Sequence, residues 1–243
     1  MNEYNEHTNN GEVLRPQGFK AWLENFWYHY KWHSIIALFL IFTISICTFQ
    51  MCRKEEYDLY VLYGGSKYIS RKVEDGNFCE YDTITASFRQ ITKDYDENGA
   101  LNVSFLDKYL LSDDELKEAD DVNLSYIYQN NEAFRDLMFS SPYYICFLSD
   151  KLYLEYAETE GVFCPIAPYT GGLELDYLDD GAVYLHSDNL TFNTLPGICD
   201  LPENTVICLK SKTVISSFFS NKENEAHFLR SEESLKAIFA YGN

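Results

Sequence analysis

The residues best suited to bind a metal ion form one acidic run, DYDENGAL, that starts at Asp94. Asp94, Asp96 and Asn98 alternate along it and Gly99 follows, which is the spacing of the first ligands in a calcium-binding loop. The bidentate acid that such a loop has at its twelfth position is missing, because Phe105 stands there. The run therefore predicts either a calcium site at Asp94, Asp96 and Asn98 or a helix-to-strand turn made by the same residues.

Two short polar junctions are candidates for binding a small ligand. Gly64, Gly65 and Ser66 follow the strand-like run YDLYVLY, and Ser149 and Asp150 follow the run YYICFL. In open α/β sheets, ligands bind beyond the carboxyl ends of the strands. The two junctions therefore predict a ligand-binding site, although Ser149 also suits the N-cap of a helix.

No set of residues in the sequence predicts catalysis. Among the five histidines, only His186 and His227 lie beyond the first 33 residues, and no HExxH, GxSxG or phosphate-loop motif is present. Asp176, Asp179 and Asp180 could form an acid–base pair, but the run DYLDDG favours a solvated turn. We expect no catalytic residue, and no cofactor apart from a calcium ion.

A long apolar stretch, Ser34–Cys52, carries no charge. As a helix its nineteen residues span roughly 28 Å, which is enough to cross the hydrocarbon of a bilayer. A cleaved signal peptide has a short basic segment before its apolar core, whereas 33 residues with four glutamates precede this one. The stretch predicts an uncleaved, single-pass transmembrane helix over residues 34–52.

An aromatic segment precedes the apolar stretch. Trp22, Trp27 and Trp32 are all the tryptophans of the chain, and such residues gather at the headgroup interface of membranes. The large apolar residues recur at helical spacing: Phe19, Trp22, Leu23, Phe26, Trp27 and Tyr30. We expect an amphipathic juxtamembrane helix over residues 18–33, either lying on the membrane or continuing into it, behind a disordered cytoplasmic tail over residues 1–17.

The orientation does not follow from charge alone, because Lys20 and Lys31 precede the stretch while Arg53 and Lys54 follow it. We expect the tail to be cytoplasmic and residues 55–243 to form one extracytoplasmic domain, since an N-terminal anchor is a simple way to export a C-terminal domain.

The domain beyond the apolar stretch is strongly acidic. Four of the 38 acidic residues and three of the 19 basic residues precede residue 53, which leaves 34 acidic and 16 basic residues and a net charge of −18 for the rest. A surface of this sign repels phosphate backbones, so we expect no nucleic-acid partner. The expected partners are the lipid bilayer and another membrane or cell-surface protein.

The cysteines indicate buried thiols more than a disulfide framework. Cys146 and Cys208 lie in apolar runs, where cysteine acts as a small hydrophobic residue, and no CxxC or Cys/His metal spacing occurs. A Cys199–Cys208 bridge is the alternative.

Strand and helix patterns alternate along residues 55–243. Helices are expected from a cap at Asp82 or Thr83 to about Tyr95, over 125–139, from Ser149 to Ala157, and from Ser231 onward, with 113–121 as a solvated connection. Strands are expected over 57–63, 101–105, 143–148, 162–166, 182–186 and 205–210. This alternation predicts an α/β fold with a mixed, mainly parallel sheet and flanking helices.

Several short segments carry resemblances to known families. The run from Asp94 to Leu101 resembles the loops of EF-hand and dockerin modules. The Gly64–Ser66 turn and the block Ser141–Glu158 weakly resemble type 2 extracellular solute-binding proteins, which implies a ligand-binding role, although the domain is short for two full lobes. The whole arrangement of aromatic segment, span and acidic domain is similar to uncharacterised single-pass membrane proteins of Gram-positive anaerobes, and that likeness implies no activity.

Three functions are compatible with these observations. The first is a membrane-anchored, non-catalytic accessory or interaction domain outside the cell. The second is a ligand-binding receptor related to solute-binding proteins. The third, a membrane-tethered hydrolase, lacks any triad or metal set that the sequence can supply.

Overall fold

A computed structural model describes residues 18–52, 57–72, 79–118, 123–212 and 221–242. The chain divides into two compact units, Met1–Glu55 and Glu56–Asn243. The predicted tail over residues 1–17 lies outside the described residues. The second unit is called the α/β unit below.

The first unit contains one helix, α1 (Phe19–Cys52), so the predicted juxtamembrane and transmembrane segments form a single continuous helix. Within it, Phe26–Phe49 is long and apolar enough to cross a membrane, and none of this stretch is buried inside the structure. As a helix, this stretch of 24 residues is about 36 Å long. It starts earlier than the predicted span, because it includes part of the aromatic segment.

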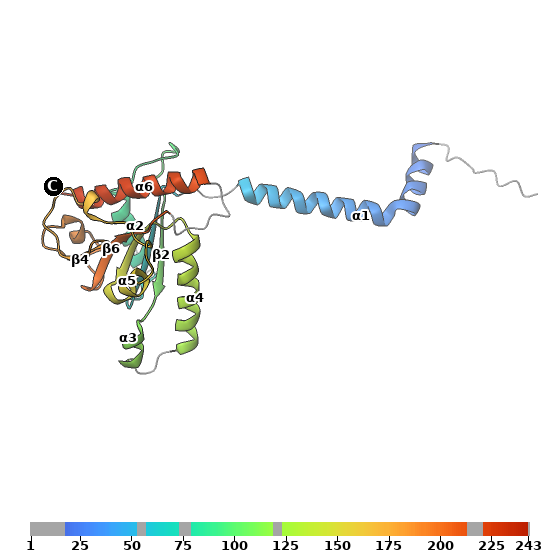
Figure 1. Ribbon diagram of the computed structural model, residues 1–243. Coiled ribbons are helices and arrows are strands. Elements are labelled where there is room, and N and C mark those ends of the chain that lie inside the picture. The colour runs from blue at the N-terminus through green and yellow to red at the C-terminus, as the bar shows by residue number, and fades with distance from the viewer. Residues whose placement is uncertain (1–17, 53–56, 73–78, 119–122, 213–220, 243) are drawn as a thin grey trace, which may run out of the picture. The chain divides into compact units, whose positions relative to one another are not determined.

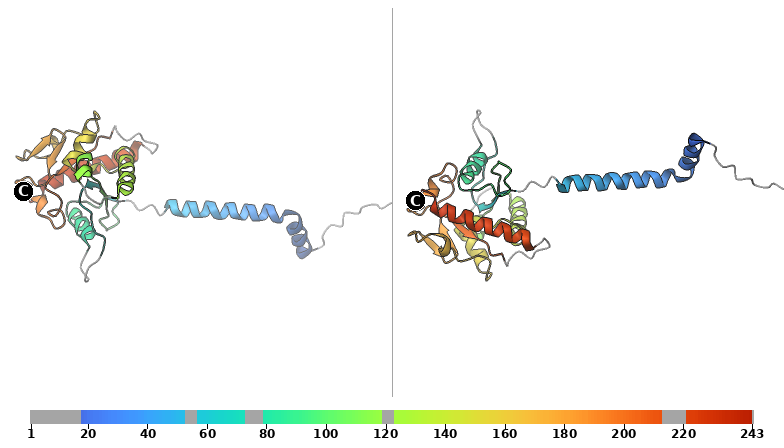
Figure 2. Two further views of the ribbon diagram at one scale, coloured as in Figure 1. Left: turned by 90° about the horizontal axis from the view of Figure 1, so that it is seen from below. Right: turned by 90° about the horizontal axis from the view of Figure 1, so that it is seen from above.

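Three hydroxyl groups of α1 are hydrogen-bonded within the helix, and several of its aromatic rings stack on one another. The hydroxyls of Thr43, Ser45 and Thr48 donate to the carbonyls four residues earlier, at 2.7–2.9 Å, so these groups need no water. The rings of Phe19, Trp22, Phe26 and Tyr30 stack in sequence along one side. Figures 1 and 2 show the first turns of α1, in dark blue, running at an angle to the rest of the helix.

The α/β unit is built on a six-stranded sheet with the order β2-β1-β3-β6-β5-β4. Its strands are β1 (Leu59–Gly65), β2 (Val103–Tyr109), β3 (Ile145–Ser149), β4 (Tyr177–Asp179), β5 (Ala182–Tyr184) and β6 (Thr205–Leu209). Its helices are α2 (Glu80–Arg89), α3 (Asp113–Glu118), α4 (Leu124–Ser140), α5 (Asp150–Ala157) and α6 (Asn221–Ala240), with short 3-10 turns η1 (Ala167–Tyr169) and η2 (Thr191–Thr194).

The sheet is mixed and mainly parallel, so the predicted fold class is confirmed. Strand β1 pairs in parallel with both β2 and β3, while β6 runs antiparallel to β3 and to β5, and β4 is antiparallel to β5. Four of the six strands, β1, β2, β3 and β5, therefore point the same way. Their carboxyl ends share one edge of the sheet, called the carboxyl edge below.

Hydrophobic cores fill both faces of the sheet, because neighbouring residues of the buried strands point to opposite sides. One core joins Val61 and Phe105 to Phe88 of α2 and to Leu235 of α6. The other joins Leu62 and Cys146 to α4 and α5. Helix α6, red in Figure 1, thus shares a face with α2, while α4 and α5 cover the opposite face. The alternation explains why YDLYVLY is apolar at nearly every position.

Helix α2 begins earlier than its predicted cap at Asp82 or Thr83. Cys79 is the N-cap residue and makes no side-chain capping bond. Instead the N–H of Tyr81 donates to the carbonyl of Ser70 at 3.2 Å. A contact across eleven positions replaces the local cap that sequence patterns identify.

The predicted strand 162–166 is reduced to an isolated bridge between Phe163 and Lys210. Pro165 lacks an N–H, so the segment cannot extend its pairing with β6. The predicted acidic connection over 113–121 contains the short helix α3, and residues 119–121 lie outside the described residues. Ser231 lies inside α6, where its hydroxyl donates to the carbonyl of His227, rather than at the start of the helix.

The end of α4 is fastened by a buried lysine. Lys210 is fully buried, and its Nζ donates to the carbonyls of Leu137, Met138 and Ser141 at 2.9, 3.1 and 3.4 Å. These groups belong to the C-terminal end of α4, where a positive charge is favourable. Burial away from water nevertheless lowers the pKa of Lys210 to about 8.

Stability should therefore rise with pH because of Lys210. The pKa of its side chain falls from 10.5 in the unfolded chain to about 8 in the folded chain, so between these values the unfolded chain binds more protons. From pH 7.5 to 9.5, the free energy of unfolding of the natural chain should gain about 2 kcal/mol relative to the Lys210→Met variant. Urea unfolding at both pH values measures the difference. Equal pH dependence in the two proteins would refute the assignment.

Candidate functional site

The structure brings the two predicted junctions together at the carboxyl edge. Gly64 of β1 is paired with Leu148 of β3, so Gly65 and Ser149 end neighbouring strands. Helices α2 and α4, which follow β1 and β2 in the chain, pack on opposite faces of the sheet. This is the arrangement in which ligands bind between adjacent parallel strands of open α/β sheets.

Side chains already pack against the residues of the two junctions. A Cβ atom at Gly64 would lie 2.7 Å from the ring of Phe134, and one at Gly65 would lie 2.8 Å from the hydroxyl of Tyr63. Ser149 is buried, and its hydroxyl accepts a bond from Leu152 at 3.4 Å as the N-cap of α5. The glycines therefore make room for aromatic rings, and the serine caps a helix.

Gly64→Ala should destabilise the α/β unit by about 2 kcal/mol, because the new methyl group overlaps the ring of Phe134. The expected fall in melting temperature is about 4–8 °C. In a Phe134→Leu background the same substitution should cost much less, since the ring is gone. Chemical unfolding of the four proteins in this double-mutant cycle measures the coupling. Strictly additive effects would contradict the contact.

A small cavity lies beside the carboxyl edge, between α4 and α5. Its volume is about 240 Å³. Leu111, Phe134 and Leu152 line its apolar part, while Glu132 and Arg135 of α4 belong to its polar part. This volume is below the range of most ligand sites, so the cavity gives limited support to the predicted ligand-binding role.

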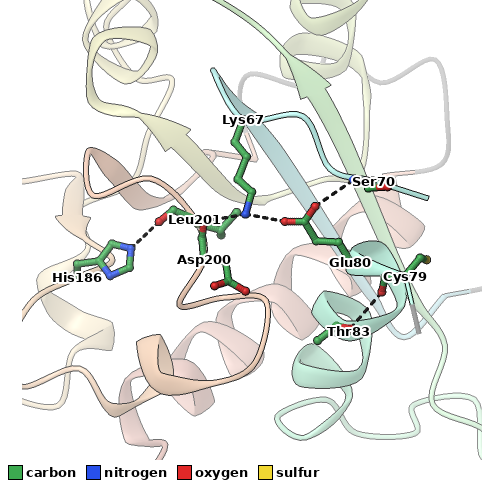
Figure 3. A network of polar contacts seen from close by, with 8 residues as sticks. All are labelled: Lys67, Ser70, Cys79, Glu80, Thr83, His186, Asp200 and Leu201. Atoms are coloured by element: carbon green, nitrogen blue, oxygen red, sulfur yellow. Dashed lines mark hydrogen bonds and ion pairs between the residues drawn. The ribbon is translucent and has the colours of Figure 1, made fainter. Parts of the chain in front are cut away.

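Figure 3 shows a polar network on the other side of the carboxyl edge. The Nζ of Lys67 lies 2.5 Å from Oε1 of Glu80 and donates to the carbonyl of Asp200 at 2.7 Å. The other oxygen of Glu80 accepts from the N–H of Ser70 at 3.0 Å. The ammonium group of Lys67 and both carboxylate oxygens of Glu80 therefore have partners within the protein. The network fastens the connection after β1 to the connection between β5 and β6.

The acidic loop, Asp94–Leu101, packs against one acidic residue that sequence reasoning missed, Asp58. Carboxylate oxygens of Asp58, Asp94 and Asp96 lie within 4.8 Å of one another. Asp58 precedes β1 and is buried, and its two oxygens accept from the N–H groups of Tyr95 and Asn102, each at 2.9 Å. An acidic residue at the start of an apolar strand was the available signal, but only the fold places it against the loop.

The loop also satisfies its own oxygens. Asp94 accepts from the N–H of Gly99 at 2.7 Å, which lowers the pKa of its carboxyl group, and Asn98 accepts from the N–H of Ala100 at 2.7 Å. These bonds make the turn that is the alternative to a calcium site. The oxygens of Asp58, Asp94 and Asp96 suit a hard cation, but Phe105 lies in the core and supplies no twelfth ligand. Calcium binding stays a prediction.

Of the three aspartates considered for acid–base chemistry, Asp179 has structural partners for its carboxylate. Asp179 ends the short edge strand β4, which replaces part of the predicted turn, and its carboxylate accepts from the Tyr153 hydroxyl at 2.7 Å and from the Gly181 N–H at 2.8 Å. The Nε2 of His186 is 2.9 Å from the carbonyl of Leu201. The hydrogen bonds of Asp179 and His186 therefore indicate that these two side chains support turns.

The thiols confirm the expected burial. Cys146 and Cys208 are fully buried and face each other across β3 and β6. Cys208 and Cys199 are both free, so the alternative bridge between them is absent.

Comparisons of this chain with protein families, with curated proteins and with solved structures found no match.

Proposed function

We propose that this protein is a single-pass membrane protein in which α1 holds an extracytoplasmic α/β unit at the membrane as a non-catalytic interaction domain. One observation carries the proposal. Phe26–Phe49 presents apolar side chains on all sides, with no burial inside the structure. In water, an exposed apolar surface of this size is strongly unfavourable, whereas lipid accepts it.

The aromatic residues support the same placement. Trp22, Trp27 and Trp32 are exposed and lie at the N-terminal side of the helix, where an aromatic belt meets the headgroups. The angle in the first turns of α1 allows this segment to lie along the membrane surface while the rest of the helix spans it (Figure 2).

The interaction role rests on the α/β unit. At its strand-end junctions, Phe134 packs against Gly64 and Ser149 caps α5, while the candidate acid–base residue Asp179 supports a turn. What the unit offers outward is an acidic, folded surface. A second membrane or cell-surface protein is the partner that suits it.

Membrane extraction tests the anchor. Cells that express the full chain are lysed and their membranes are washed with carbonate at high pH. The chain should stay in the pellet and dissolve only in detergent. Recovery of the intact chain in the aqueous wash would refute the anchoring.

Cys199 provides a test of orientation, because it is exposed and free. A membrane-impermeant maleimide should label the natural chain on intact cells, and a Cys199→Ser variant should lose that label. If labelling at Cys199 requires permeabilised cells, the α/β unit is cytoplasmic and the proposed orientation is wrong.

A ligand-binding receptor is the second candidate function. The Gly64–Ser66 and Ser149–Asp150 junctions lie at the ends of neighbouring strands, which favours this function. The ring of Phe134 packs against Gly64, which opposes it. A thermal-shift screen of sugars, amino acids, peptides and divalent ions on the detergent-solubilised chain should show no stabilisation that depends on these junctions. A ligand whose effect disappears in a Ser66 or Asp150 variant would revive this candidate.

A further inference from the structure

A groove lies between the connection that follows η1 and the C-terminal turns of α6, away from the junctions described above. Its volume is about 370 Å³, which falls within the range of small-molecule sites. Figure 1 shows the end of α6, marked C, beside these connecting segments. Tyr169, Leu173 and Phe239 supply its apolar surface, and Lys236 is its charged residue.

Lys236 is the cation that this groove offers to a ligand. Its Nζ lies 5.7 Å from the centre of the Tyr169 ring, and among the described residues it forms no ion pair. The acids nearest to it along α6 have other partners. Glu232 accepts from the Tyr169 hydroxyl at 2.6 Å, and Glu233 is paired with Lys93. The positive charge of Lys236 is therefore available to an anion.

Tyr169 stays neutral at physiological pH. Burial and the neighbouring carboxylate of Glu232 raise the pKa of its phenol. The Tyr169 ring therefore offers an uncharged, apolar surface. The hydrogen bond to Glu232 holds the ring in place, and the ammonium group of Lys236 lies beside it. A flat or aliphatic group fits such a surface.

The turn at the rim of the groove adds a backbone donor, because Gly171 is one of its lining residues. Gly171 and Gly172 have φ angles of 65° and 83°, and the N–H of Leu173 closes the turn by donating to Thr170 at 3.2 Å. Thr170 itself is right-handed, with φ −78° and ψ −6°. A right-handed residue followed by a left-handed one exposes successive N–H groups that bind anions. In the described chain, the N–H groups of Gly171 and Gly172 have no acceptor.

We propose that this groove binds a small organic carboxylate with an apolar body. The carboxylate pairs with Lys236 and the N–H of Gly171, and the body packs against Pro168, Tyr169 and Leu173. Charge complementarity carries the assignment, since the ammonium group of Lys236 and the N–H of Gly171, which has no acceptor among the described residues, border one apolar surface. The proposal goes beyond the anchoring role and does not depend on it, because every residue involved belongs to the α/β unit.

The test uses the full chain in lipid nanodiscs and three matched probes: 3-phenylpropionate, 3-phenylpropan-1-ol and 3-phenylpropylamine. Saturation-transfer NMR, with empty nanodiscs subtracted, reports binding to the protein. The carboxylate should bind, and the alcohol and the amine should bind about 10-fold or more weakly, because they lack the anion that Lys236 recognises.

Two lysine variants locate the site. Lys236→Met keeps most of the aliphatic stem and should weaken binding of 3-phenylpropionate by about 10- to 100-fold. Lys222→Met removes a charge from the exposed start of the same helix and should leave binding unchanged. A third variant, Leu173→Ala, trims the apolar surface and should weaken the carboxylate, alcohol and amine alike.

Three results would overturn the proposal. They are the absence of carboxylate binding above empty nanodiscs, equal binding of the amine, and equal losses in the Lys236 and Lys222 variants. Circular dichroism of each variant confirms that the fold is intact. Carbonate extraction of membranes from cells that express the same chains reports separately on the anchor, so failure of one proposal is distinguishable from failure of the other.

Discussion

Replacing Leu38 and Ile41 together with arginine should release most of the chain from the membrane. Both side chains are exposed and lie near the middle of Phe26–Phe49. An arginine at the centre of a transmembrane helix costs about 2.5–3.5 kcal/mol, so two cost about 6 kcal/mol. The fraction that resists carbonate extraction should fall from nearly all of the chain to below about a fifth.

A variant with the same added charge elsewhere serves as the matched control. Phe19→Arg with Leu23→Arg changes two exposed residues of α1 that precede Phe26. At the headgroup interface arginine is tolerated, so this variant should remain in the membrane pellet. If both pairs of substitutions behave alike, then α1 does not lie in lipid, and another partner covers its apolar surface.

Asp58→Ala should be the most destabilising single substitution considered for the α/β unit. It removes the acceptor for two N–H groups, those of Tyr95 and Asn102, at a site where Asp58 is only 3% exposed. Each buried donor left unpaired costs about 1–3 kcal/mol, so we expect a loss of about 3 kcal/mol. That loss corresponds to a melting temperature lower by about 6–12 °C.

Asp96→Ala tests whether the effect comes from anchoring the loop. Asp96 belongs to the loop that Asp58 contacts, but it is exposed and its carboxylate accepts from the neighbouring Asn98. Its replacement should cost less than about 0.5 kcal/mol. Equal losses in the two variants would mean that the bonds of Asp58 are unimportant.

Adding calcium in the same melting experiments should raise the melting temperature of the natural chain, but not of Asp94→Asn, if the predicted ion site is real.

The sequence predicted the elements that depend on local pattern. The nearly continuous apolar runs around Val61 and Phe147 indicated strands buried on both sides, and both are central strands of the sheet. Ser149 was recognised as a possible cap because serine at such a position satisfies a free N–H. Alternation of strands and helices was enough for the α/β class.

Long-range contacts decided the features that the sequence missed. Cys79 is the N-cap of α2 although its side chain makes no capping bond, because the carbonyl of Ser70 accepts from the N–H of Tyr81 in the first turn. Asp58 joins the acidic loop only because β1 brings it beside Tyr95. The Gly64–Ser66 and Ser149–Asp150 junctions lie at the ends of neighbouring strands, but nothing in their own residues indicates that the ring of Phe134 packs against Gly64. The register of distant elements determines such outcomes.

The last helix of the chain covers the first strand of the sheet. α6 packs over β1, and residues such as Phe228 and Leu235 close the same core as Leu59 and Val61. During synthesis, this side of the sheet stays uncovered until α6 has been made. A premature stop within α6 should therefore leave the apolar face of the sheet exposed, although β1 to β6 have all been synthesised. Such a product is prone to aggregation and is removed by quality-control proteases.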